Sequence, residues 1–220
     1  MIRAVIFDFD GTLADTRENI LNAYRRVISE QGCVVSDDYV ERKIGIGGRM
    51  VLKNIFDENK IPHNEDFIKK NLARIETLRI EAIDKIRIFS GTLPLLDGLY
   101  KKFKLALATM STGNIIDLLL QKRGMKKYFD VVVTARDVTL AKPHPEIFLT
   151  CAKKMGKKPK QCVVVEDSIF GVEAAESAGM QCIAVTTGSY SSEELLDAGA
   201  DLIVDSVENK SEILKFLKRG

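Results

Sequence analysis

Two aspartates stand two residues apart near the start of the chain. Asp8 and Asp10 directly follow a short apolar run over residues 4–7. Because side chains alternate along a strand, both carboxylates are expected to point to the same side. One ionised carboxylate of such a pair can attack an electrophile and bind a cation, while the other donates a proton to a leaving oxygen. A turn at Gly11 with incidental acids accounts equally well for these residues taken alone.

Hydroxyl side chains follow a second apolar run, residues 105–108. The sequence there is Thr109-Met110-Ser111-Thr112, and a helical pattern comes after it. Hydroxyls and backbone N–H groups at the start of a helix can hold an anion. Capping of the helix alone also explains them, so this segment gains weight only from the other polar segments.

A lysine stands beside two prolines further along the chain. Lys142 precedes Pro143-His144-Pro145, and prolines restrict the backbone around it. A cation fixed in this way suits a phosphate group and the carboxylate that attacks it. A mobile lysine in a surface turn is the alternative, and His144 is expected to be structural.

A second acidic pair follows a third apolar run, residues 163–165. Glu166 and Asp167 precede Ser168, and hard oxygen ligands at this strand end would supply what Mg²⁺ needs alongside Asp8. Each of the four polar segments comes at the carboxyl end of an expected strand or in the loop beyond it. Their joint occurrence favours one site over four accidents.

The elements that must position these groups are predicted from apolar runs and helical spacing. Strands are expected at six runs: residues 4–7, 105–108, 131–134, 163–165, 183–185 and 202–204. Helical patterns separate them, and strand and helix alternate from about residue 91 onward. This alternation predicts an α/β fold with a doubly wound, mostly parallel, Rossmann-like sheet.

Residues 17–85 break this rhythm because their apolar positions recur at helical spacing. A helical block inserted after the first strand is expected to lie as a cap over the carboxyl ends of the strands. The predicted division is a core of residues 1–16 and 86–220 and a cap of residues 17–85. Arg49, in a glycine-rich segment of the cap, is a candidate contact for the anionic remainder of a substrate, or else an exposed arginine in a helix connection.

Composition excludes several classes of function. The 220 residues include 33 basic and 31 acidic ones, with no sustained basic stripe, so nucleic acid is not an expected partner. No 18 apolar residues follow one another and the chain opens on a strand-like run, which predicts no membrane span and a cytoplasmic location. The four cysteines lack metal-type spacing and are expected to be reduced. A monomer or small homo-oligomer is expected.

The four polar segments together resemble a known family. Asp8 to Thr16, Thr109, Lys142 to Pro145 and Glu166 to Ser168 look like the four motifs of the haloacid dehalogenase superfamily. Residues 166–180 are also similar to its β-phosphoglucomutase and phosphoglycolate phosphatase branch. The resemblance spans nearly the whole chain and implies a helical cap after the first motif.

Roles for individual residues follow from this resemblance. It implies that Asp8 is the nucleophile that forms an aspartyl-phosphate, and that Asp10 is first the general acid and then the base for water. Mg²⁺ would be bound by the carboxylates of Asp8 and Asp167 and by the carbonyl oxygen of Asp10, with Glu166 as an indirect or water-mediated ligand.

The resemblance also implies how a substrate is held. Thr109, the backbone N–H of Met110, and Lys142 would bind the phosphoryl oxygens. Thr16, at the end of the first motif, and Arg49 are the candidates for binding the rest of the substrate. The implied partner is a small phosphorylated metabolite, such as a sugar phosphate or a phosphoglycolate-like compound.

The function implied is a magnesium-dependent phosphatase, and two alternatives stay open. A sugar-phosphate mutase is one, although Ile20 stands where β-phosphoglucomutase has a cap histidine, which favours hydrolysis. A non-catalytic binding or regulatory protein is the other, although the presence of Asp10 and Lys142 argues against it. Because Asp10 is present, a dehalogenase is disfavoured.

Overall fold

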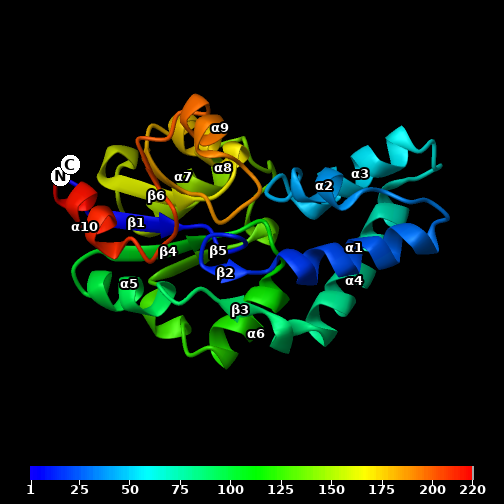
Figure 1. The fold of residues 1–220 in the computed structure, drawn as a ribbon, viewed down its shortest axis with the longest axis horizontal. Helices are drawn as coiled ribbons and strands as arrows, with labels where there is room; N and C mark the ends of the chain where they lie inside the picture. The colour runs from blue at the N-terminus through cyan, green and yellow to red at the C-terminus, as the bar shows by residue number, and fades with distance from the viewer. Residues whose placement is uncertain (220) are drawn as a thin grey trace.

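A six-stranded parallel sheet forms the centre of the molecule (Figure 1). The computed structural model describes residues 1–219, and its sheet has the strand order β5-β4-β1-β6-β7-β8. The strands are β1 (Ala4–Phe7), β4 (Lys104–Ala108), β5 (Val131–Val133), β6 (Cys162–Glu166), β7 (Gln181–Val185) and β8 (Leu202–Val204). Each predicted apolar run overlaps one of these strands, and the predicted doubly wound α/β fold is confirmed.

The two faces of the sheet carry side chains of different size. Val5 and Phe7 of β1 point to one face, with Leu105 and Leu107 of β4, and join a large hydrophobic cluster. Three helices cover this face: α5 (Thr92–Leu99), α6 (Gly113–Lys122) and α10 (Lys210–Arg219). Branched and aromatic side chains therefore fill the space beneath them, as expected for a strand buried on both faces.

Smaller side chains line the opposite face. Ala4, Ala106 and Ala108 point to it, and α7 (Glu146–Lys154), α8 (Ile169–Ser177) and α9 (Ser192–Asp197) cover it. Short 3₁₀ helices complete the connections: η2 (Lys126–Tyr128), η3 (Ala135–Asp137) and η4 (Pro159–Gln161). Cys151, Cys162 and Cys182 are buried in or beside this layer as free thiols, as the sequence predicted.

The helical segment between the first two strands of the large sheet lies to one side of that sheet (Figure 1). This segment, residues 17–85, is here called the insert. It contains α1 (Arg17–Glu30), α2 (Asp37–Glu41), α3 (Gly48–Glu58), α4 (Glu65–Glu81) and the 3₁₀ helix η1 (Ile83–Lys85). Its helices enclose a separate hydrophobic cluster, from Ile20 on α1 to Ile75 on α4.

A small antiparallel ribbon joins the insert to the rest of the chain. β2 (Ala14–Asp15) pairs with β3 (Arg87–Ile88), and Arg87 Nη2 lies 2.8 Å from Asp15 Oδ2 across the ribbon. The chain enters the insert just after β2 and leaves it just before β3. Two-residue strands carry no apolar periodicity, so the sequence did not predict them. That the insert is a separate cap domain stays a prediction.

Candidate active site

The register of the sheet brings the first and last polar segments to one edge. Phe7 of β1 pairs with Leu107 of β4 on one side and with Val165 of β6 on the other. The residues that follow these three positions therefore emerge together at the carboxyl edge of the sheet, where parallel α/β sheets form their sites. Asp8 continues the ladder by donating its backbone N–H to the carbonyl of Val165 at 2.9 Å.

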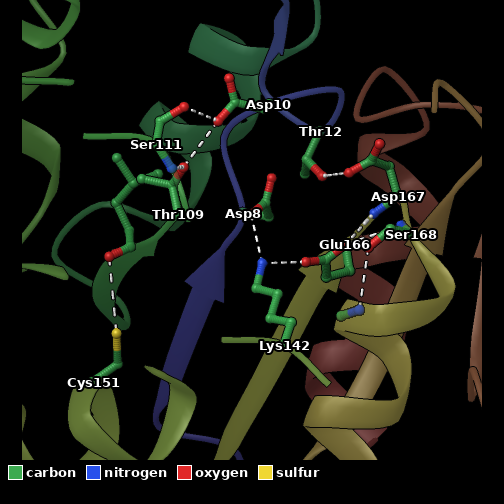
Figure 2. A network of polar contacts seen from close by, with 12 residues as sticks. Asp8, Asp10, Thr12, Thr109, Ser111, Lys142, Cys151, Glu166, Asp167 and Ser168 are labelled. Atoms are coloured by element: carbon green, nitrogen blue, oxygen red, sulfur yellow. Dashed lines mark hydrogen bonds and ion pairs between the residues drawn. The ribbon is translucent and has the colours of Figure 1, made fainter. Parts of the chain in front are cut away.

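Lys142 is buried beneath Asp8 (Figure 2). Its Nζ donates to Asp8 Oδ1 at 2.6 Å and to Glu166 Oε1 at 2.5 Å, and it lies 5.1 Å from the ring centroid of Phe148. Burial alone would lower the pKa of Lys142, but the charges of Asp8 and Glu166 outweigh burial and raise it. The lysine predicted from its neighbouring prolines is therefore a fixed ammonium in contact with Asp8.

Protein donors bind both oxygens of Glu166, and its predicted part as an indirect or water-mediated metal ligand stays a prediction. Oε1 accepts from Lys142, while Oε2 accepts from the backbone N–H groups of Asp167 and Ser168 at 2.9 Å and from the Ser168 hydroxyl at 3.0 Å. The physical reason is strand alternation: Glu166 shares the face of Val164, toward α7, whereas Asp167 lies beyond the strand. Glu166 holds Lys142 in place.

Asp167 faces the opening of the site and is closely surrounded. Its Oδ1 accepts from Thr12 Oγ1 at 2.9 Å, from the turn that follows β1. Gly11 and Gly188 approach it so closely that a Cβ on either would lie 2.2 Å from Asp167 Oδ2. Gly11 also has a φ of +86°, which favours glycine. The backbone thus forms a tight cradle around one carboxylate.

Burial and neighbouring negative charges disfavour the ionised forms of both Asp8 and Asp167. Burial raises the pKa of Asp8 to about 8, with the charges of Glu166 and Asp10 adding to the shift and Lys142 opposing it. Burial also raises the pKa of Asp167 well above its ordinary value, and the charges of Glu166 and Asp8 add to it. Three buried carboxylates face one buried ammonium, so a further positive charge would stabilise the site.

Asp10 lies on the other side of the site, against the loop after β4 (Figure 2). Its Oδ2 accepts from Thr109 Oγ1 at 2.9 Å and from Ser111 Oγ at 2.7 Å. Thr109 in turn accepts the backbone N–H of Ser111 at 3.0 Å. The loop predicted to bind an anion therefore binds the carboxylate of Asp10 in this structure.

The insert supplies a residue that the sequence reasoning missed. Arg79, on α4, is buried and donates from Nη2 to Asp10 Oδ1 at 3.0 Å and from Nη1 to Ser111 Oγ at 2.9 Å. A signal for it exists in the sequence, because Ile68, Asn71, Ile75 and Arg79 recur at helical spacing and share the buried face of α4. A charged residue in such a stripe indicates a buried partner.

A cavity of about 960 Å³ opens between the insert and the carboxyl edge of the sheet. Asp8, Asp10 and Asp167 line it from the sheet, and residues of α1 to α4 line it from the insert. The predicted substrate contacts Thr16 and Met110 also line it, with Thr16 buried at the start of α1. The arrangement can hold a small molecule against the carboxylate of Asp8.

Arg49 lines the cavity, and its guanidinium is paired with a carboxylate of the insert. It lies at the start of α3, where its Nη2 pairs with Glu65 Oε2 at 2.5 Å, and 61% of its side chain is exposed. That Arg49 binds the anionic remainder of a substrate stays a prediction. The ion pair with Glu65, sixteen positions later, could not be predicted from spacing.

Comparison with known proteins decides the family. A sequence model of the haloacid dehalogenase-like hydrolases matches residues 5–185, which include the four predicted polar segments at the carboxyl edge of the sheet. The chain belongs to this family. The family predicted from the four motifs is thus confirmed, and with it the prediction of a hydrolase.

Two curated relatives and one solved structure show how near the similarity is. The chain is 34% identical to the phosphorylated carbohydrates phosphatase of Thermotoga maritima, over 99% of each chain. It is also 34% identical to the fructose-1-phosphate phosphatase YqaB of Escherichia coli, over 82% of this chain and 95% of the relative. The crystal structure of β-phosphoglucomutase from Clostridium difficile superposes with a TM-score of 0.88 at 30% identity, covering 100% of this chain and 98% of that one.

Proposed function

We propose that this protein is a magnesium-dependent phosphatase that hydrolyses a small phosphorylated metabolite through an aspartyl-phosphate on Asp8. The observation that carries the proposal is the contact between Asp8 and Lys142, buried at the base of a cavity that a substrate can enter. Lys142 binds Oδ1 of Asp8, which leaves Oδ2 to attack a phosphorus atom. An ammonium at this position also offsets the negative charge that the nucleophile and a phosphate bring together.

The residues present fit a magnesium ion. Asp8 and Asp167 are both buried with raised pKa values, so a divalent cation would relieve the repulsion between them. Within residues 1–219, no group of three or more His, Cys, Asp and Glu side chains converges as a metal site. Two carboxylates are enough, since Mg²⁺ in phosphate-binding sites commonly uses one or two carboxylates, water and the substrate phosphate. With the carbonyl oxygen of Asp10, they would hold the ion, which would neutralise charge on the transferred group.

The proposed reaction has two steps, and Asp10 transfers a proton in each of them. In the first, Asp8 Oδ2 forms a bond to phosphorus while the bond from phosphorus to the ester oxygen breaks, and Asp10 gives its proton to that oxygen. In the second, water attacks the aspartyl-phosphate, Asp10 takes the proton of that water, and inorganic phosphate leaves with Asp8 restored. Lys142 stays bound to Asp8 throughout and fixes its orientation.

A phosphorylated carbohydrate is the substrate class we propose. Two relatives that match most of this chain are named for phosphorylated carbohydrates and for fructose 1-phosphate. The cavity volume of about 960 Å³ is at the upper end of the usual range for small-molecule sites, which leaves room for a sugar as well as a phosphate. A cytoplasmic location and a contact between Thr109 or Met110 and the phosphoryl group stay predictions. Within residues 1–219, no helix is both long enough and apolar enough to cross a lipid bilayer.

A sugar-phosphate mutase is the second candidate, because a β-phosphoglucomutase structure is among the similar folds. Phosphate return to a sugar calls for an acid–base group in the insert, and the family resemblance implies Ile20 at that position, which has no group that can exchange a proton. Ile20 is 5% exposed and part of the hydrophobic cluster of the insert. Hydrolysis is therefore favoured.

The experiment is a phosphate-release assay with p-nitrophenyl phosphate and a panel of sugar phosphates, with Mg²⁺ and with chelator. Wild type is expected to release phosphate only with Mg²⁺, and Asp8→Asn to lose activity by at least ~10⁴-fold, as removal of a nucleophile does. Asp197→Asn, an exposed aspartate on α9, is the matched control and should keep full activity. Full activity in Asp8→Asn would refute the proposal, and an isomeric sugar phosphate without net phosphate release would favour the mutase.

A further inference from the structure

Arg79 joins three separate parts of the molecule through one side chain. Its Nε donates to Asn19 Oδ1 on α1 at 3.0 Å, its Nη1 to Ser111 Oγ, and its Nη2 to Asp10 Oδ1. The side chains of Arg79 and Asp10 are only 8% and 10% exposed. A buried ion pair is costly to form unless its hydrogen bonds are well satisfied. The ion pair between Arg79 and Asp10 therefore differs from an ordinary surface ion pair.

Asn19 holds Arg79 from two directions. It accepts from Arg79 Nε at 3.0 Å, and its own Nδ2 donates to the backbone carbonyl of Arg79 at 3.0 Å. The planar guanidinium is therefore fixed at its inner edge, and its two outer nitrogens point in set directions. Both of those nitrogens donate to residues outside the insert, at the carboxyl edge of the sheet. The insert thus presents a rigid fork to Asp10.

The two oxygens of Asp10 have different kinds of partner. Thr109 and Ser111, which lie on the sheet side of the cavity, bind Oδ2. Arg79, which belongs to the insert, binds Oδ1. The Ser111 hydroxyl that donates to Oδ2 itself accepts from Arg79 Nη1, so Arg79 acts on both oxygens of Asp10, directly on Oδ1 and through Ser111 on Oδ2. The orientation of the Asp10 carboxyl group is therefore complete only when the insert is in place.

We propose that Arg79 is a positioning residue for Asp10, which orients the carboxyl group toward the leaving oxygen of the substrate while the insert covers the cavity. The proposal rests on the phosphatase function proposed above, and it makes proton donation to the leaving group depend on the position of the insert. An open insert would carry Arg79 away and leave Asp10 misoriented. Misplacement by about 1 Å can cost on the order of 10²-fold in rate.

The dependence of rate on the leaving group tests this proposal. p-Nitrophenolate leaves as a stable anion and needs no proton, whereas a sugar alkoxide needs one from Asp10. kcat/KM covers only the steps up to departure of the leaving group. In Arg79→Gln we expect kcat/KM to fall by about 10²-fold for the best sugar phosphate of the panel and by less than about 3-fold for p-nitrophenyl phosphate.

Three further variants sharpen the result. Arg74→Gln removes another arginine of α4, which pairs with Glu30 at 3.3 Å on the exposed side, and should leave both substrates unchanged. Arg79→Lys keeps the charge but cannot reach three acceptors, so an intermediate, leaving-group-dependent loss is expected. In an Asp10→Asn background, Arg79→Gln should add little further loss for the sugar phosphate, because both changes act through one group.

The outcomes separate the inference from the function on which it rests. If wild type releases no phosphate from any substrate, the proposed phosphatase function is wrong. If wild type is active but Arg79→Gln loses kcat/KM equally for both substrates, or loses none, the positioning role is wrong. Should Arg79→Gln fail to fold by thermal unfolding, Arg79→Lys decides by the same comparison of the two substrates, and equal loss or none overturns the proposal.

Discussion

Glu166 accepts a hydrogen bond from Lys142 at 2.5 Å while both side chains are about 1% exposed, so the ammonium beneath Asp8 has its orientation set by a second buried carboxylate. The remaining oxygen of Glu166 is held by the turn that begins α8. Lys142 is therefore fixed from both sides, by Asp8 and by Glu166. The position of Asp8, the proposed nucleophile, depends on this chain of contacts.

Glu166→Gln is expected to lower kcat/KM about 10- to 100-fold with a smaller change in KM. The amide nitrogen of glutamine must face either Lys142 or the N–H groups of residues 167 and 168, and both are donors, so one contact is lost. Glu176→Gln, at the exposed end of the same helix α8, is the control. Steady-state kinetics on purified proteins measure the effect, and activity equal to wild type in Glu166→Gln would contradict it.

Gly11→Ala is expected to abolish most activity by displacing Asp167. A Cβ at position 11 would meet Asp167 Oδ2 at 2.2 Å, and the φ of +86° adds backbone strain of about 1 kcal/mol. Gly32→Ala is a matched control, since Gly32 has a φ of +77° but nothing within 4 Å of the added atom. Both variants should lose similar backbone stability, while only Gly11→Ala should lose Mg²⁺-dependent activity, by about 10²-fold or more.

The strands and the polar groups that follow them could be predicted from the sequence because both signals are local. A run of apolar residues such as 163–165 predicts a buried strand. The acidic residue that follows the run must then lie at the end of that strand. The direction in which each acid turns is also local in principle. Glu166 is the last residue of β6, and Asp167 follows the strand. Because side chains alternate along a strand, the two acids point in different directions and bind different partners.

The contacts between the insert and the sheet could not be predicted in the same way. Spacing shows that Arg79 lies on the buried face of α4, but not that this face meets Asp10. That meeting depends on the ribbon formed by β2 and β3, whose two-residue strands have no sequence signal. Arg49 is a similar case, because the glycine-rich pattern around it predicted a substrate contact but not its ion pair with Glu65.

The stability of the metal-free protein should depend on pH through Asp8. Folding raises the pKa of Asp8 from 3.8 to about 8. Between these two pH values, the folded state therefore binds more protons than the unfolded state. The stabilisation is complete below about pH 4 and is lost as the pH rises toward about 8. Thermal unfolding with chelator should therefore show Asp8→Asn gaining on wild type as the pH rises from 5 to 8, by about 2–4 °C for each kcal/mol.

Magnesium should oppose the loss of stability at high pH, because a divalent cation stabilises the ionised carboxylates of Asp8 and Asp167. Adding Mg²⁺ at pH 8 is expected to raise the unfolding temperature of wild type more than that of Asp8→Asn. A difference between the two proteins that stays constant from pH 5 to pH 8 in chelator would show that Asp8 does not titrate with a raised pKa. Asp197→Asn should follow wild type at every pH.

Tyr190→Phe should weaken the docking of the insert on its other side without disturbing the chemistry. The Tyr190 hydroxyl donates to the backbone carbonyl of Arg42 at 2.5 Å, and the Arg42 guanidinium lies 4.9 Å from the ring centroid. Phenylalanine keeps the ring but loses the hydrogen bond, which costs about 0.5–1.5 kcal/mol. Because that energy favours the covered cavity, we expect KM to rise about 2- to 10-fold with kcat little changed. Tyr100→Phe, at the exposed end of α5, is the control, and a fall in kcat with unchanged KM in Tyr190→Phe would contradict this view of the insert.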